Sequence, residues 1–115
     1  MPKKSTKKDI IYLEHILKSI EKIERYIKDI NYKKFLNDEK LTDALARQLG
    51  IIGEATNNFT QSFRKKHPNI EYRKIIAMRN FLIHEYFNVE RKIVWNTCKN
   101  NIPKLKEILI KIKKT

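Results

Sequence analysis

The sequence predicts an all-α protein, an antiparallel bundle of four or five helices. Its 115 residues fit one domain and leave no room for a second hydrophobic core. With only 2 Gly and 3 Pro the chain has few places to turn, whereas a sandwich or barrel of short strands needs many. Apolar residues instead recur every three or four positions over long segments, which is the period of an amphipathic helix.

The first predicted helix follows a basic segment and is about twenty residues long. Asp9 is its predicted N-cap, and Asn31–Leu36 is predicted to be a connection. The apolar stripe of this helix comprises Leu13, Ile16, Ile20, Ile23, Ile27 and Ile30.

The second predicted helix contains both glycines of the chain, Gly50 and Gly53. Asn37 is its predicted N-cap. An interior Gly costs about 1 kcal/mol relative to Ala, so two within one turn indicate the close approach of another backbone or of a ligand. The stripe of this helix comprises Leu41, Leu45, Leu49, Ile52, Ala55, Phe59 and Phe63.

Two further helices follow a break at Pro68. Asn69 is predicted to cap the third and Asn88 the fourth. Pro103 falls inside the apolar stripe of the fourth, so it either kinks that helix or starts a short fifth one. The stripe of the third helix comprises Tyr72, Ile75, Ile76, Leu82, Ile83 and Tyr86, and that of the fourth comprises Val94, Cys98, Ile102, Leu105, Leu109 and Ile112.

The net charge of +13 is concentrated at the two ends of the chain. Residues 1–8 and 99–115 together carry +9 of it, and residues 9–98 carry the remaining +4. A polyanion such as RNA would be attracted to such ends. The alternative is compositional, because Lys, Ile and Asn are all abundant, as an AT-rich genome would produce, while Arg, which suits phosphate better, is scarce.

One cysteine, Cys98, excludes an internal disulfide framework. No signal peptide is expected, because Glu14 interrupts the short apolar run after the basic start. No segment approaches the roughly 18 apolar residues of a membrane span. The sequence therefore predicts a soluble, cytoplasmic protein that does not enter a membrane.

Arg79 breaks the apolar pattern of the third helix, because the residues three and four positions away on both sides are Ile or Leu. A guanidinium in such a place needs a partner. One interpretation is a structural ion pair with Glu54, beside Gly53 on the second helix. The other is a guanidinium at the floor of a site or at a subunit interface.

His84 lies five residues after Arg79, which is a rotation of about 140° around a regular helix. The two side chains of one chain would therefore point in different directions. Either the helix ends between them, or two copies of the segment meet across a two-fold axis. Asn80 shares a face with His84, and Tyr86 shares a face with Arg79. The three histidines and Cys98 have no metal-ligand spacing, so neither a metal nor a cofactor is predicted.

The segment 78–87, MRNFLIHEYF, resembles the signature of HEPN-domain proteins and, more narrowly, of HepT toxins: Arg, four residues, His, one residue, Tyr. The flanking segments IIGEA (51–55), PNIEYRKII (68–76), VW (94–95) and NIPKL (101–105) also resemble that family and follow in the same order. Tyr72 departs from the pattern, where a Trp is expected.

The resemblance implies a single HEPN-like domain over residues 9–115, after a flexible basic tail of residues 1–8. It implies dimerisation through the motif-bearing third helix, possible assembly into larger oligomers, and a joint cleft between two copies. It also implies an RNase toxin of a type VII-like toxin–antitoxin system. The antitoxin would be an MntA-like nucleotidyltransferase that silences the toxin by AMPylation of Tyr86.

The residues fit metal-independent cleavage of RNA, whose 2′-hydroxyl is the nucleophile. His84 suits proton transfer and Arg79 suits the phosphate, and these are the predicted catalytic residues. Asn80, which could bind the phosphate or orient His84, and Glu54 are predicted to support them. Two symmetry-related copies of His84 could divide the acid and base roles, and the product would be a 2′,3′-cyclic phosphate.

Two other functions are compatible with the same residues. One is a non-catalytic helical module that binds RNA or a nucleotide in the dimer cleft, with His84 as a contact only. The other is a scaffold or partner-binding bundle in which Arg79 and Glu54 form a core ion pair.

Overall fold

The computed structural model describes residues 6–84 and 90–114, and within them it is all-α, as predicted. No strand occurs in these residues, and no helix among them is long and apolar enough to cross a membrane. The elements in chain order are α1 (Lys7–Ile27), α2 (Tyr32–Leu36), α3 (Glu39–Asn57), α4 (Gln61–Lys66), α5 (Tyr72–His84), α6 (Arg91–Asn96), the π-helical segment η2 (Thr97–Asn101) and α7 (Ile102–Lys114).

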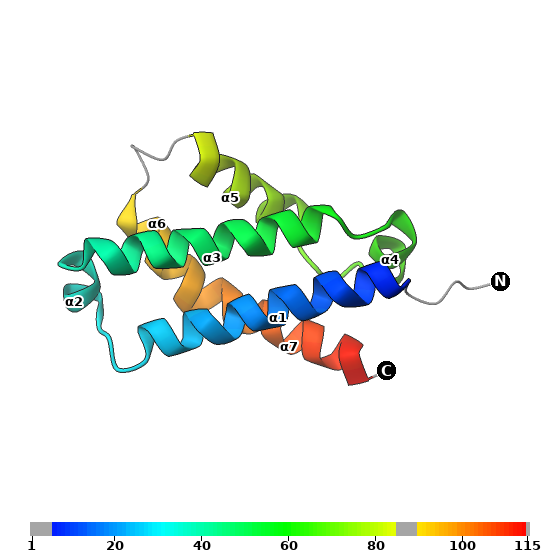
Figure 1. Cartoon of the computed structure of the whole chain (residues 1–115), viewed down its shortest axis with the longest axis horizontal. Coiled ribbons are helices and arrows are strands. Elements are labelled where there is room, and N and C mark those ends of the chain that lie inside the picture. Colours follow the sequence, from blue (N-terminus) through cyan, green and yellow to red (C-terminus); the bar gives the residue numbers. More distant parts are fainter. Residues whose placement is uncertain (1–5, 85–89, 115) are drawn as a thin grey trace.

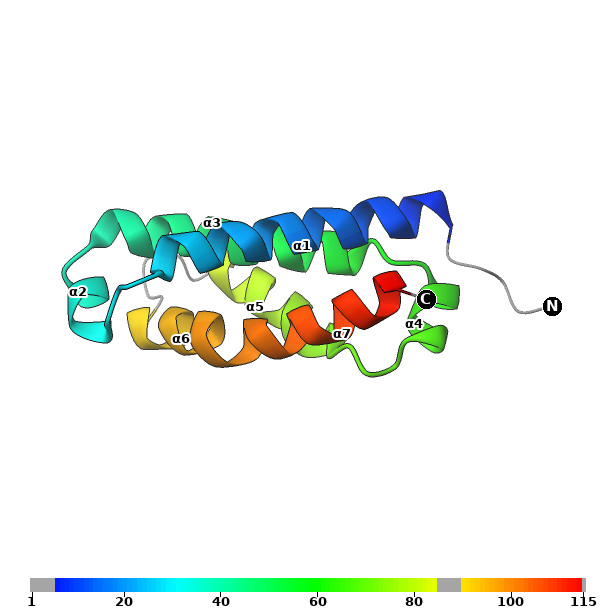
Figure 2. The same ribbon diagram turned by 90° about the horizontal axis from the view of Figure 1, so that it is seen from below.

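The three long helices of the first two thirds of the chain lie side by side, with α3 between α1 and α5 (Figure 1). Seen at a right angle, α6, η2 and α7 form one continuous rod on the opposite side from α1 and α3 (Figure 2). The molecule is elongated, 53 × 29 × 19 Å. The core lies between α1, α3 and α7, where the predicted stripes meet; its residues that are at most 1% exposed include Ile16, Ile20, Ile23, Leu45, Ile52 and Leu109.

The start of α1 differs from the prediction, because Thr6 and not Asp9 is the N-cap. Asp9 occupies the third helical position, where its carboxylate accepts a bond from the backbone N–H of Thr6 and completes a capping box. The predicted basic tail thus overlaps the first turn of the helix, which begins at Lys7.

Asp9 also links the start of α1 to the start of α4. It is fully buried and accepts hydrogen bonds from the backbone N–H of Thr60 at 2.9 Å and from the Thr60 hydroxyl at 2.8 Å. Burial raises the pKa of the Asp9 carboxyl, but the hydrogen bonds from Thr60 and Thr6 together lower it by more than burial raises it. The pKa of Asp9 therefore lies below its usual value. One carboxylate therefore contributes to the caps of both α1 and α4.

The predicted connection at Asn31–Leu36 is wrong in part, because α2 forms there. Asn31 caps this helix by accepting from the Lys34 backbone N–H at 2.8 Å. Phe35 is fully buried, and its ring centroid lies 4.9 Å from that of Trp95. The short helix places one aromatic ring in the core at the end of the molecule.

Three further boundaries differ from the predictions. The N-cap of α3 is Asp38 instead of Asn37, and it accepts from the Leu41 backbone N–H at 3.0 Å. The second predicted helix is two helices, since α3 ends at Asn57 and Thr60 caps α4. Asn69 does not cap α5, which begins at Tyr72. The predicted cap Asn88 lies outside the described residues.

Pro103 lies in the first turn of α7, directly after the π-helical segment. Proline lacks an N–H and its ring clashes with the carbonyl four residues earlier, so a regular helix is unfavourable there. The wider π turn between Thr97 and Asn101 resolves this conflict without ending the rod. The sequence left a kink and a fifth helix open, and the structure has a new helix in line with the old one.

Candidate functional site

The predicted site residues lie on α5 and on the face of α3 that it packs against. Arg79 and Asn80 are on α5, and Glu54 is on α3. Both Arg79 and His84 belong to α5, which is one α-helix from Tyr72 to His84. The possibility that the helix ends between Arg79 and His84 is therefore wrong.

The Arg79 guanidinium is held from two sides. Its Nη2 lies 2.5 Å from Glu54 Oε2, which is the ion pair predicted from the sequence. Its Nη1 donates to Asn80 Oδ1 at 2.8 Å. The Arg79 side chain is 28% exposed and that of Glu54 is 54% exposed, so the pair lies at the rim of the helix packing and not in the core.

Gly53 brings α3 and α5 into close contact at this point. A Cβ atom on Gly53 would lie 2.2 Å from Arg79 Cβ, 2.9 Å from Arg79 Cγ and 3.2 Å from the Ile75 carbonyl oxygen. Only glycine leaves room for the stem of Arg79. The predicted close approach of another backbone is confirmed at Gly53; at Gly50 a Cβ would meet no atom of the described residues within 4 Å, so no helix of this chain packs closely there.

The two remaining predicted residues, His84 and Tyr86, have side chains that the structure does not describe. His84 is the last residue of α5, and the structure describes its backbone. Tyr86, the predicted AMPylation site, lies outside the described residues. Their predicted roles therefore remain predictions.

The other titratable groups of interest have structural surroundings. His67 packs against Phe63, and burial, with a smaller effect of Lys66, lowers its pKa. Tyr72 donates its hydroxyl to the His67 carbonyl at 2.7 Å and contacts the edge of Phe59, so the residue that departs from the family pattern has a packing role. Burial raises the pKa of the Cys98 thiol to about 12, so this thiol is not a nucleophile at neutral pH.

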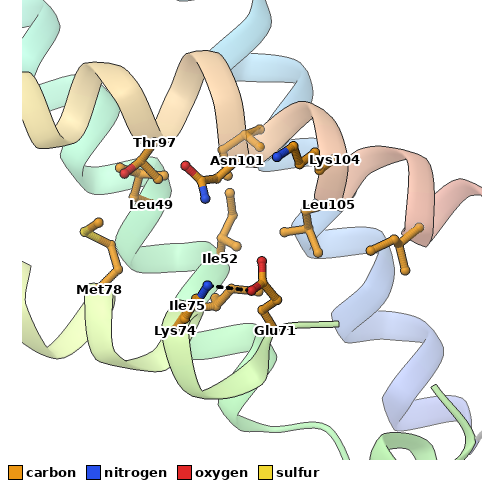
Figure 3. A pocket seen from close by; sticks show the side chains of 12 residues that line it. Leu49, Ile52, Glu71, Lys74, Ile75, Met78, Thr97, Asn101, Lys104 and Leu105 are labelled. Carbon is orange, nitrogen blue, oxygen red and sulfur yellow. Dashed lines mark ion pairs between the residues drawn. The ribbon is translucent and has the colours of Figure 1, made fainter. Parts of the chain in front are cut away.

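An apolar pocket of about 220 Å³ separates α5 from the rod of η2 and α7 (Figure 3). Ile52, Ile75, Met78 and Leu105 are among its lining residues, and of the predicted site residues whose side chains the structure describes, neither Glu54 nor Arg79 nor Asn80 lines it. An ion pair between Lys74 and Glu71, 2.8 Å apart, lies at its edge. Because this pocket lies between α5 and α7, the two helices pack little against each other. The position of α5 therefore depends mainly on its contact with α3, in which Gly53 lies.

A fixed guanidinium that remains partly exposed is suited to binding a phosphate group. The fold and the site together thus define a helical protein with a fixed, partly exposed arginine at the α3–α5 contact. Among the described residues, no three His, Cys, Asp or Glu side chains are close enough together to hold a metal ion.

Comparison with known proteins gives the family. The family described as ribonuclease HepT-like matches residues 16–112, and the chain belongs to it. A protein of Caldanaerobacter subterraneus named "putative RNase" is 45% identical over 106 residues, which are 89% of this chain and 95% of that protein. A protein of Thermococcus cleftensis named "probable ribonuclease HepT" is 43% identical over 103 residues, or 90% of this chain and 94% of that one.

A third relative is longer. A protein of Methanocaldococcus jannaschii named "gamma-glutamylcyclotransferase and putative RNase" is 45% identical over 107 residues, 92% of this chain. This chain spans about half of that protein, since the match covers 48% of its length. No solved structure matches the chain.

Proposed function

We propose that this protein is a metal-independent endoribonuclease and the toxin of a type VII-like toxin–antitoxin system. The observation that carries the proposal is the Arg79 guanidinium, which Glu54 and Asn80 hold in place while 28% of the side chain remains exposed. This arginine opens the Arg-x-x-x-x-His motif of a chain that belongs to the HepT-like ribonuclease family. RNA is the proposed substrate.

The proposed reaction is an internal transesterification of RNA. His84 removes the proton of a 2′-hydroxyl, the 2′-oxygen bonds to the adjacent phosphorus, and the bond from phosphorus to the 5′-oxygen breaks. A second His84 protonates the departing 5′-oxygen, so the products are a 2′,3′-cyclic phosphate and a 5′-hydroxyl. Arg79 binds the phosphate and stabilises the negative charge that grows on it. Asn80 and Glu54 are positioning residues, because they fix the guanidinium.

The proposed active protein is a homodimer that meets through α5, and larger assemblies are compatible with it. The continuity of α5 supports this arrangement, because five residues of regular helix separate Arg79 from His84 by about 140°. A second copy can supply the His84 that faces a given Arg79. A joint cleft would then contain two arginines and two histidines.

The proposed control is covalent. An MntA-like nucleotidyltransferase would transfer AMP to the hydroxyl of Tyr86 and release pyrophosphate from ATP. The added phosphate could pair with Arg79, and the adenosine would occupy space that RNA needs.

RNA cleavage in the presence of a metal chelator tests the enzymatic part of the proposal. We expect cleavage with 2′,3′-cyclic phosphate ends by the wild type. His84→Ala should lower the rate at least 100-fold, since a general acid or base contributes about 10²–10⁴-fold. His15→Ala is the matched control, because His15 is exposed on α1 and should leave the rate unchanged. Full activity of His84→Ala would refute the assignment.

A further inference from the structure

A second hollow lies on the outer face of α5 and leads to the proposed site. It has a volume of about 830 Å³, and its lining includes Arg64 of α4 together with Arg73, Ile76, Ala77 and Asn80 of α5. The α5 residues are spaced by three or four, so they lie on one face of the helix. Asn80, at the end of this groove, is the residue that accepts from Arg79. Asn80 therefore borders the groove and also contacts the fixed guanidinium, although Arg79 itself does not line the groove.

The groove carries a positive charge. Arg64, Arg73 and Lys74 line it, and Glu71 is its one carboxylate among the described residues. Glu71 is already paired with Lys74 at 2.8 Å. These four side chains leave a net charge of about +2, which favours an anionic occupant.

Arg64 is a preorganised cation in this groove. Its Nε donates to the Phe59 carbonyl at 3.3 Å, and its Nη2 donates to the Asn57 carbonyl at 3.0 Å. Its guanidinium carbon lies 5.3 Å from the centre of the Tyr72 ring. These three contacts fix the guanidinium, and none of them is to a carboxylate, so its positive charge is not neutralised by them. Because the side chain is already ordered, a ligand that binds it loses less conformational entropy.

We propose that this groove binds the single strand of RNA that flanks the cleaved bond, with its phosphates on Arg64, Arg73 and Lys74. The inference rests on the proposed ribonuclease function and adds the path of the substrate. Seven residues of helix separate Arg73 from Asn80, about 10 Å, so the cations contact nucleotides beyond the scissile one. The side chains of Ile76 and Ala77 give the groove an apolar floor for ribose or base.

The proposal is tested by the salt dependence of RNA binding to the inert His84→Ala protein. Each phosphate contact to a single strand contributes about 0.7 to the slope of log affinity against log salt. Arg73→Gln with Lys74→Gln should lower that slope by about 1.4, so that between 50 and 200 mM salt the parent loses about sevenfold more affinity than the variant. Glu71→Gln should act in the opposite direction and tighten binding.

The control removes the same charges elsewhere. Lys18 and Arg25 are exposed on α1, which lies on the far side of α3 from α5 (Figure 1). Lys18→Gln with Arg25→Gln should keep the slope of the parent. Arg64 is not substituted, because its bonds to two carbonyls also support the fold.

The outcomes separate the groove from the ribonuclease function. Equal slopes for the groove variant and the α1 variant overturn the groove. Loss of the dimer in the groove variant, with an unchanged slope per protomer, assigns this face to a contact between copies and also overturns it. A groove variant with the expected slope change, together with a wild type that binds RNA but does not cleave it, supports the groove and refutes the proposed reaction.

Discussion

Replacing Gly53 by Ala tests whether the α3–α5 contact positions the site. The new methyl group would lie 2.2 Å from Arg79 Cβ and 3.2 Å from the Ile75 carbonyl oxygen. Neither is the far end of a flexible side chain, so a rotamer change cannot relieve the clash. The helices must separate by more than 1 Å for the two carbon atoms to reach a normal contact of about 3.5 Å.

Two opposing effects determine the free energy of unfolding. Ala is favoured over Gly in a helix by about 1 kcal/mol. Overpacking typically costs about 1–3 kcal/mol, and a clash with the stem of a residue lies at the upper end of that range. The ion pair of Arg79 with Glu54 adds little, since exposed pairs contribute about 0–1 kcal/mol. We expect a net loss of about 1–2 kcal/mol, and for a domain of this size each kcal/mol lowers Tm by about 4 °C.

Gly50→Ala is the matched control on the same helix. No atom of the described residues would lie within 4 Å of its Cβ, so the variant should gain up to about 1 kcal/mol from helix propensity. Both variants are measured by urea and thermal unfolding at one protein concentration, since dimerisation would make stability depend on concentration. RNA cleavage is measured in parallel, and a shift of about 1 Å at Arg79 can cost about 100-fold in rate. Equal stability of the two variants would refute the reasoning.

Three other predictions address the helix caps, the proposed control and the composite site. Asp9→Asn should cost about 1.5–3 kcal/mol at pH 7, as hydrogen bonds to a charged group do. Because folding lowers the pKa of Asp9, its contribution is complete above the usual carboxyl pKa and disappears as the pH falls through the folded value; urea unfolding at pH 7 and pH 3 should show this acid sensitivity in the wild type and less of it in the variant. Tyr86→Phe should stay unmodified and toxic beside a cognate nucleotidyltransferase, and intact-protein mass spectrometry that finds no AMP on the silenced wild type would contradict covalent control. Arg79→Ala and His84→Ala, each inactive alone, should partly restore cleavage when mixed under conditions of subunit exchange, whereas no recovery despite mixed dimers would place both groups of a site in one chain.

The sequence predicted the helices well and their ends less well. The apolar stripes identify the helices because burial has the period of the helix, and residues such as Ile16, Ile23 and Leu45 are buried as predicted. The ends depend on which of several polar neighbours becomes the cap. Thr6 is the cap because Thr-x-x-Asp forms a capping box, which is a local signal in the sequence; the buried Asp9 carboxylate also accepts from Thr60, a contact between residues 51 positions apart. Spacing within one helix contains no information about such a contact.

The break between α3 and α4 was hidden for a related reason. Phe59 and Phe63 continue the apolar spacing of α3, and their rings stack at 4.0 Å. Phe59 lies in the turn after α3 and Phe63 lies in α4. Because they are still four residues apart, as in a helix, the apolar pattern continues without an interruption. Only Thr60 gave a local signal, because it is a favoured N-cap residue.

The candidate site was predicted in part. An arginine amid apolar neighbours, together with a nearby glycine, indicated the pair of Arg79 with Glu54 as one of two interpretations, and the structure contains this pair. The bond from Arg79 to Asn80 was not predicted, because consecutive residues point about 100° apart on a helix and their side chains do not usually face each other. The long arginine side chain turns back to reach its neighbour. Arg64 and Arg73 gave no sequence signal, since the groove forms only when α4 and α5 come together.

The contacts of Arg79 also explain why this position requires arginine for the proposed chemistry. A lysine at this position would use its single ammonium nitrogen to pair with the Glu54 carboxylate. Fewer of its N–H donors would then be available to a phosphate. A guanidinium presents five N–H donors in a planar fork. Glu54 lies against Nη2 and Asn80 takes a bond from Nη1, so the two acceptors engage different nitrogens and fix the plane of the fork. The carboxylate thereby orients the cation without occupying all of its donors, and a phosphate can bind the part of the fork that the close helix contact at Gly53 holds at the surface.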